Sequence, residues 1–343
     1  MFNYLKICVF CLFSIYIIIL IISMSKKKTF YELTNKQDFD IDFNENKFLP
    51  IKNIDRYWYL VNKGYERMKQ TDIVIGGLFM NSSGIFDKFK ARIENMSNLF
   101  KSLKCVFFEN DSTDNSRILL LDWEEQNPNI HIIKCEENNY CLLKSSKAIK
   151  DGQFSETRMI KMAKYRNILL NYIKKNFTHT SFVGFIDTDM KGGISFDGIA
   201  HSFGIEPELK WDMCSAFGMT GLILTLNRLI YYDFLALKTS DYAPNKVNNM
   251  NYIEAIKLYF KYIHNLKRGD EPVLVQSAFC GFALYKMDSI RNSDYTPIDN
   301  NYVCEHIIFH DNMIRNGFDK IYINPNMLLF AGKQGSYTIP FYY

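Results

Sequence analysis

Residues 182–189 read Phe-Val-Gly-Phe-Ile-Asp-Thr-Asp, a short apolar run that ends in two carboxylates. An apolar run of this length with polar residues at its end is typical of a strand buried on both faces. Because alternate residues of an extended segment share a face, Asp187 and Asp189 should point to the same side. Together they can hold one hard divalent cation, such as Mn²⁺ or Mg²⁺. The alternative interpretation is a solvated turn after a strand, since two aspartates at this spacing also occur by chance.

The sequence on both sides of this stretch alternates between strand and helix patterns. Three further apolar runs predict buried strands, over 73–78, 105–108 and 130–134. Three other stretches predict helices, over 86–103, 115–125 and 158–175. Only a polar loop over 136–157 interrupts the alternation. The predicted fold class is therefore α/β, with a mostly parallel sheet flanked by helices. Ligands of such sheets bind at the carboxyl ends of the strands.

The N-terminal segment has a different character. Residues 7–24 form an uncharged apolar run about as long as a helix that crosses a bilayer. The run leads into Lys26, Lys27 and Lys28 rather than into a small-residue cleavage site, which favours an uncleaved anchor. We expect a single-pass membrane protein of the secretory pathway or of a viral or host membrane. Because the basic cluster follows the helix, the side of the membrane stays open.

Composition narrows the function classes. A chain of 343 residues with 48% hydrophobic residues can form one large globular domain, or at most two. The predicted organisation is an anchor over 1–28, a polar stem and lead-in over 29–70, and the main domain over 71–343. The net charge of +4 is small and the basic residues are spread out, which argues against nucleic-acid binding. The cysteines show no tight metal-ligand spacing, so buried thiols are favoured over zinc or disulfides.

A second polar motif follows the predicted strand 105–108 and reads Glu-Asn-Asp-Ser-Thr-Asp over 109–114. Either Thr113 or Asp114 can cap the helix predicted to follow. A cap does not explain the acidic residue Glu109 at the end of the strand. A carboxylate there can accept hydrogen bonds from a nucleobase or a ribose.

The order of these motifs resembles that of family 2 type glycosyltransferases of the GT-A fold. Residues 109–116 are similar to the D-D-G-S-T-D-G-T signature, Arg166-Asn167 to the R-N pair, and 185–189 to F-L-D-S-D. Later, 279–285 resemble the glycine-containing strand under the acceptor, and Glu305-His306 with 317–321 resemble the E-D … G-y-k-i region. The resemblance covers about residues 71–330 and lies in motif order rather than in close identity. A weaker likeness to fungal capsule-associated mannosyltransferases rests on 231–236, 109–114 and the Arg166-Asn167 pair.

The resemblance implies a catalytic domain of the GT-A (Rossmann-like) fold over 71–343. Such an enzyme moves a hexose from a nucleotide-diphosphate sugar to a hydroxyl of a glycan, glycoprotein or glycolipid. A divalent metal, Mn²⁺ or Mg²⁺, is the implied cofactor. The implied donor-binding residues are Glu109, Asp111, Arg166, Asn167, Asp187 and Asp189, of which Asp187 and Asp189 hold the metal.

Glu305 is the implied general base or acceptor-orienting carboxylate. A base there would take the proton of the acceptor hydroxyl as it attacks the anomeric carbon. The sequence departs from the family at the next position, where His306 stands in place of a second acid. No histidine follows His310, so a late histidine ligand for the metal is lacking. An inverting outcome therefore does not follow from the resemblance.

Other interpretations of these residues stay open. His306 and His310 lie four apart and can either bind a metal or sit as polar residues on a helix rim. The aromatic residues Tyr231, Tyr232 and Phe234 can stack on a sugar ring or belong to the core.

Two other protein classes share part of the pattern. A sugar-nucleotide pyrophosphorylase needs a glycine-rich phosphate loop after the first strand, and residues 75–79 are too short for one. A non-catalytic carbohydrate-binding or interaction module would show no tight metal-dependent nucleotide binding. Nucleotide binding with and without Mn²⁺ separates that class from a transferase.

Overall fold

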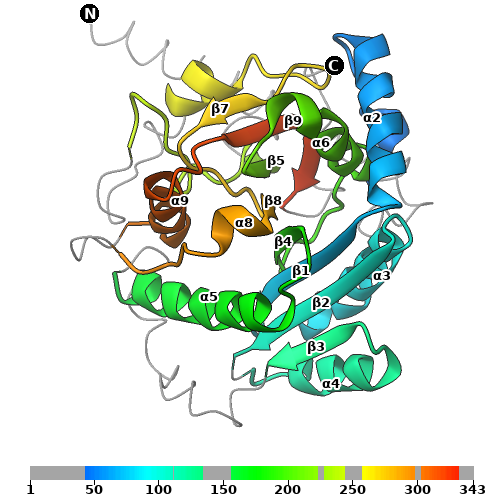
Figure 1. Cartoon of the computed structure of the whole chain (residues 1–343), viewed down its shortest axis with the longest axis vertical. Coiled ribbons are helices and arrows are strands. Elements are labelled where there is room, and N and C mark those ends of the chain that lie inside the picture. The colour runs from blue at the N-terminus through cyan, green and yellow to red at the C-terminus, as the bar shows by residue number, and fades with distance from the viewer. Residues whose placement is uncertain are drawn as a thin grey trace, which may run out of the picture.

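A computed structural model of the chain describes residues 43–110, 112–133, 156–222, 228–243, 257–297 and 303–331. Within these ranges one nine-stranded sheet has the order β3-β2-β1-β4-β8-β5-β9-β7, and β6 pairs with β5. The strands are β1 (Asp72–Phe79), β2 (Ser102–Glu109), β3 (Ile130–Ile133), β4 (Phe182–Asp187), β5 (Met213–Leu222), β6 (Arg228–Tyr231), β7 (Val273–Val275), β8 (Phe282–Lys286) and β9 (Ile321–Phe330). Figure 1 shows this sheet surrounded by helices.

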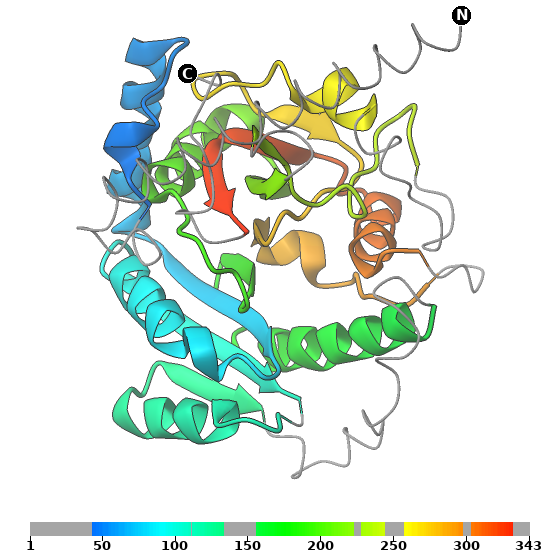
Figure 2. The ribbon, with the colours of Figure 1, turned by 180° about the vertical axis from the view of Figure 1, so that it is seen from behind.

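The helices cover both faces of the sheet. They are α2 (Ile54–Met68), α3 (Phe86–Ser97), α4 (Ser116–Gln126), α5 (Glu156–Asn176), α6 (Phe196–Leu209), α8 (Met287–Ile290) and α9 (Glu305–Arg315), with short turns η1 (Glu45–Lys47), η2 (Ser83–Ile85) and η5 (Tyr259–Ile263). In Figure 1 α5 lies over the strands, whereas in Figure 2, the view from behind, α3 lies over them.

The N-terminal half is the predicted βαβαβ unit. Strands β3, β2, β1 and β4 are parallel neighbours in that order. The chain moves outward from β1 to β3 and then returns to β4 on the other side of β1. Right-handed crossovers therefore place α3 and α4 on one face and α5 on the other. The reversal of strand order between β1 and β4 creates a crevice at their carboxyl ends, where ligands of such sheets bind.

The C-terminal half differs from the prediction of a mostly parallel sheet. Strand β8 is antiparallel to both β4 and β5, and β7 is antiparallel to β9. Only β5 and β9 are parallel there. The sheet is therefore mixed. Strands buried on both faces show the same apolar run in either direction, so their pattern does not reveal how they pair.

The lead-in before residue 71 packs against the domain. Helix α2 buries one face at helical spacing, formed by Tyr57, Leu60, Val61, Gly64 and Met68. It crosses α6 so closely that a Cβ at Gly64 would lie 1.7 Å from the carbonyl oxygen of Ala200. Phe43 and Phe48 are also buried, with ring centroids 5.5 and 5.2 Å from that of Phe330. The described part of the predicted polar stem and lead-in, 29–70, thus contributes side chains to the core.

The predicted membrane location requires a correction. No helix in the described ranges is long and apolar enough to cross a bilayer. The apolar run 7–24, on which the prediction of a single-pass anchor rested, lies outside the described residues, as do 136–155 of the predicted polar loop. The single-pass membrane location is therefore not retained.

Candidate functional site

The loops that follow β1 and β2 are joined at the crevice beside β4. The backbone N–H of Asn81 donates to Ser112 Oγ at 3.0 Å, and Asn81 Oδ1 accepts from the N–H of Thr113 at 2.7 Å. The N–H of Ser82 donates to Ser116 Oγ at 2.8 Å. Asn81 has a φ of 51°, a left-handed conformation that asparagine tolerates better than most residues. The two loops thus form one polar ledge at the carboxyl edge of the sheet.

The two aspartates of the opening motif lie at this edge, at the end of β4. Thr188, between them, is buried, and its hydroxyl donates to the carbonyl oxygen of Leu78 at 2.6 Å. That bond ties the turn after β4 to β1. Asp187 is half-buried, whereas Asp189 is exposed. The motif therefore presents one half-buried and one exposed carboxylate at the end of β4.

Arg166 connects two motifs that are far apart in the sequence. Its Nε donates to Glu305 Oε1 at 3.0 Å and its Nη2 donates to Asp187 Oδ1 at 3.3 Å. Both Arg166 and Glu305 are only 5% exposed. The guanidinium also lies over the ring of Phe279, 5.1 Å from its centroid. The carboxyl end of β4 and the first residue of α9 are therefore held together by one buried cation.

Negative charge is concentrated around Asp187. Burial raises the pKa of Asp187 to about 7, although the Arg166 guanidinium opposes the shift. The carboxylates of Asp189, Asp233 and Glu305 raise the pKa of Asp187 further. Four acidic side chains thus face one arginine, a surplus of negative charge that a bound cation would neutralise.

Sequence reasoning gave Asp233 and Tyr232 no sharp role, but both lie at this site. Asp233 Oδ2 accepts from the backbone N–H of Cys280 at 3.2 Å. Tyr232 is 38% exposed, and burial together with the carboxylates of Asp187 and Asp233 raises its pKa. Tyr231 and Phe234, by contrast, belong to the core. The weak likeness over 231–236 assigned no role to Asp233, so the fold was needed to place its carboxylate here.

Glu109 occupies the predicted strand end but is fully buried. Its Oε1 accepts from the N–H of Ser112 at 2.7 Å and its Oε2 from Arg117 Nε at 2.6 Å. In the same loop, Asp114 accepts from the N–H of Ser116, the first residue of α4, at 2.9 Å, but the N-cap residue is Asn115 rather than Thr113 or Asp114. Glu109 therefore shapes the loop from within. Contact of Glu109 with a nucleobase or ribose stays a prediction.

The other predicted donor-site residues are placed as follows. Asn167, next to Arg166, accepts from the N–H of Tyr295 at 2.8 Å, so it fixes the loop before α9. Asp111 lies outside the described residues.

The pair His306 and His310 does not form a metal site in the structure. His310 is fully buried, and its ring nitrogens bond Ser277 Oγ at 2.8 Å and Tyr285 Oη at 2.9 Å. The ring of His306 stacks on Phe279 with centroids 3.8 Å apart. Burial lowers the pKa of both histidines, so both are neutral at pH 7. Among the described residues no group of three or more His, Cys, Asp or Glu could hold a metal ion. The interpretation as rim residues is also wrong, because both side chains are interior.

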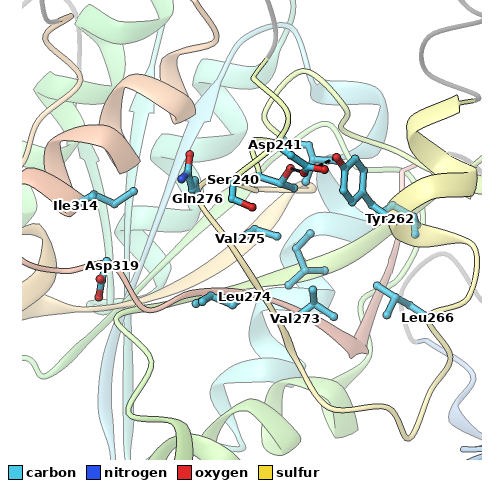
Figure 3. Close-up of a pocket in the computed structure, with 14 residues that line it drawn as sticks. Ser240, Asp241, Tyr262, Leu266, Val273, Leu274, Val275, Gln276, Ile314 and Asp319 are labelled. Carbon is cyan, nitrogen blue, oxygen red and sulfur yellow. Dashed lines mark hydrogen bonds between the residues drawn. The ribbon is translucent and has the colours of Figure 1, made fainter.

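A pocket of about 430 Å³ lies against β7 and the segment that leads to Asp241 (Figure 3). Its walls come from 237–241, η5, β7 and the C-terminal end of α9. Asp241 accepts hydrogen bonds from Tyr262 Oη and Lys261 Nζ at 2.5 and 2.7 Å, which fixes the Tyr262 ring at the wall. Aliphatic side chains with a few polar groups are typical of small-molecule sites of this size.

The similarity of this chain to known proteins is low. No protein-family model and no curated protein matches the sequence. Among solved structures, the chain is similar to S. aureus TarS 1-349 in complex with UDP-GlcNAc, with a TM-score of 0.44 and 12% identity over 77% of this chain and 59% of that one. It is also similar to the mannosyltransferase PcManGT from Pyrobaculum calidifontis in complex with GDP-Man and Mn²⁺, with a TM-score of 0.42 and 12% identity over 80% of this chain and 65% of that one.

The chain thus spans less than two thirds of the length of either protein. With 12% identity and TM-scores below 0.5, neither likeness assigns a fold family or a function to this chain.

Proposed function

We propose that this protein is a metal-dependent glycosyltransferase of the GT-A fold. It would move a hexose from a nucleotide-diphosphate sugar to a hydroxyl of a glycan, glycoprotein or glycolipid. The observation that carries the proposal is the bridge made by Arg166. This buried cation joins Asp187, at the carboxyl end of β4, to Glu305, which lies 139 positions after Arg166 in the chain. Both carboxylates come from motifs expected in such an enzyme, and they meet where the strand order reverses.

The donor half fits a divalent cation. Asp187 and Asp189 would offer hard oxygen ligands, while the hydroxyl of Thr188 between them bonds the carbonyl oxygen of Leu78 in β1. Two carboxylates suffice, because Mg²⁺ at nucleotide sites is held by one or two carboxylates together with substrate phosphates and water. A metal bound there would supply Lewis-acid stabilisation of the departing nucleoside diphosphate. The ledge formed by the loops after β1 and β2 lies beside it and offers polar groups to the nucleoside.

Arg166 and Glu305 would keep the reacting groups in place. Glu305 is buried and bonded to Arg166, which favours the acceptor-orienting role over direct proton transfer among the two roles implied by the resemblance. The exposed ring of Tyr232 stands beside the same carboxylates and is suited to stack on the transferred sugar. The pocket next to Asp241 and Tyr262 is the proposed site for a remote part of the acceptor.

Hydrolysis of a panel of UDP- and GDP-hexoses by the full chain, with Mn²⁺ or with EDTA, tests the proposal. We expect turnover of at least one donor only with the metal. Asp189→Ala should reduce that turnover at least about 100-fold, because an exposed metal ligand is lost while the core is untouched. Asp288→Ala is the matched control, since Asp288 is exposed and follows β8 at the opposite end of β4.

A non-catalytic carbohydrate-binding module would give a different result. It would hydrolyse no donor with any metal, and Asp189→Ala would behave like Asp288→Ala. The first finding would exclude the proposed transferase activity, and the second would exclude the proposed metal-binding role of Asp189.

A further inference from the structure

The turn between β7 and β8 has an unusual backbone next to the acidic cluster. Cys280 has a φ of 58° and Gly281 a φ of 81°, so two consecutive residues are left-handed. Glycine adopts this conformation freely, whereas a residue with a Cβ adopts it at a cost of about 1 kcal/mol. Strained residues of this kind persist only where their surroundings hold them, and they are frequent at functional sites.

Asp233 is the side chain that holds this turn. Its Oδ2 accepts from the N–H of Cys280 at 3.2 Å, and the N–H of Ala236 also bonds its carboxylate. On the other side, Cys280 is fully buried against Gly218, where a Cβ would lie 2.8 Å from the Cys280 carbonyl oxygen. The turn is thus fixed between the backbone of β5 and one carboxylate.

The residues on either side of Cys280 support the donor site directly. The carbonyl oxygen of Gly281 accepts from the N–H of Asp187 at 2.8 Å. The ring of Phe279 lies under the Arg166 guanidinium and stacks on His306. A shift of the turn would therefore move the first metal-site aspartate and the arginine bound to it together.

We propose that Asp233 is a positioning residue of the donor site, which aligns Asp187 and Arg166 by holding Cys280 in its left-handed conformation. The inference rests on the proposed function. In it, Asp233 touches neither metal nor sugar, and its contribution is that of a hydrogen-bond acceptor to the turn. An amide at this position can make the same bond without the charge.

Titration calorimetry of the nucleoside diphosphates UDP and GDP in the presence of Mn²⁺, with the full chain, tests the inference. We expect Asp233→Ala to weaken binding at least about tenfold, because a hydrogen bond to a charged acceptor is lost. Asp233→Asn should recover most of that loss, because its amide oxygen accepts from Cys280. Thermal unfolding of each variant reports whether it is folded.

A second substitution at the turn separates backbone geometry from packing. In the Asp233→Ala background, Cys280→Gly removes the cost of the positive φ, whereas Cys280→Ala removes the same thiol and keeps that cost. We expect glycine to restore binding at least about threefold over alanine. Equal affinities for the two double variants, or an Asp233→Asn variant as weak as Asp233→Ala, would overturn the inference.

Failure of the proposed function gives a separate result. A wild-type chain that binds neither nucleotide with Mn²⁺ would overturn the function together with the inference. Wild-type binding with the wrong variant pattern would overturn the inference alone.

Discussion

Replacing Arg166 tests the buried ion network at the centre of the site. Arg166→Met keeps a long apolar side chain but removes the bonds to Glu305 at 3.0 Å and to Asp187 at 3.3 Å. The side chains of Arg166 and Glu305 are 6% and 7% exposed, so water cannot replace the lost cation. Removing one partner of a buried pair costs about 3–5 kcal/mol, because the other charge stays buried. We expect Arg166→Met to lower the free energy of unfolding by that amount.

A double-mutant cycle shows whether the loss comes from the unpaired charge. Glu305→Gln alone should lower the free energy of unfolding by about 1–2 kcal/mol. Arg166 still has two acceptors in that variant, Asp187 and the side-chain amide oxygen of the new glutamine. The double variant removes both members of the pair. Its loss should be smaller than the sum of the single losses by at least about 1.5 kcal/mol.

Urea unfolding of the full chain, followed by the fluorescence of the buried tryptophans Trp123 and Trp211, measures these values. Arg291→Met is the control, since Arg291 forms an exposed pair with Asp288 that should contribute about 0–1 kcal/mol. The reasoning is refuted by an Arg166→Met loss no larger than that of the control, or by strictly additive losses in the cycle.

Three further outcomes follow from the packing, the histidines and the pocket. Gly64→Ala should destabilise the protein by about 3 kcal/mol or more in thermal or urea unfolding, because its Cβ would meet the α6 backbone, while Gly84→Ala, with nothing within 4 Å, should change stability by less than about 0.5 kcal/mol. Burial lowers the pKa of His201 and His310 to about 3. Below pH 6.5 these histidines therefore bind protons in the unfolded chain but not in the folded one. Their neutral burial stabilises the protein fully above that pH, and the free energy of unfolding falls as the pH falls, by about 1.4 kcal/mol per histidine at pH 5.5. Urea titrations at pH 7.5 and 5.5 measure this loss of stability. Replacing either histidine, as in His201→Gln or His310→Gln, should reduce the loss. A stability that does not change between the two pH values would contradict the reasoning. Tyr262→Ala should raise the acceptor KM at least about threefold in initial-rate kinetics, and an equal rise in the donor KM would argue against an acceptor pocket.

Much of the N-terminal half was predictable because its signals are local. The runs before Glu109 and Asp187 identify β2 and β4, and the alternation with helices identifies a parallel βαβαβ unit. Helix α3 ends at Ser97 rather than at 103, because the chain must turn before β2 begins at Ser102. The spacing of apolar residues predicts the presence of a helix more reliably than it predicts the residue at which the helix ends.

The C-terminal half was less accessible, because its decisive contacts join residues that are distant in sequence. The direction of β8 depends on its pairing with β4 and β5, and no local pattern encodes that pairing. Asp233 lies in the segment 231–236, whose weak likeness assigned it no role, and the site includes it because the Cys280 turn lies beside it. His306 looked like a polar surface residue at helical spacing, yet its ring stacks on Phe279 in the interior. A polar residue packed on an aromatic ring shows the same sequence pattern as an exposed one.

The same limit applies to Glu109. Its position at the end of β2 was predicted, but the bonds to Ser112 and Arg117 depend on how the following loop folds back. A sequence motif places a carboxylate at the edge of the sheet. It does not say whether the carboxylate faces the ligand or the loop.

The most direct test of the central claim is the electron paramagnetic resonance signal of Mn²⁺ titrated with the full chain, with and without UDP or GDP. If Asp187 and Asp189 hold a metal together with a nucleoside diphosphate, the signal of free Mn²⁺ should fall when protein and nucleotide are both present, beyond the fall with nucleotide alone. Asp189→Ala should abolish that additional loss, and Asp288→Ala should leave it intact. A wild-type signal that matches the nucleotide-only titration, or an unchanged response in Asp189→Ala, would contradict the claim.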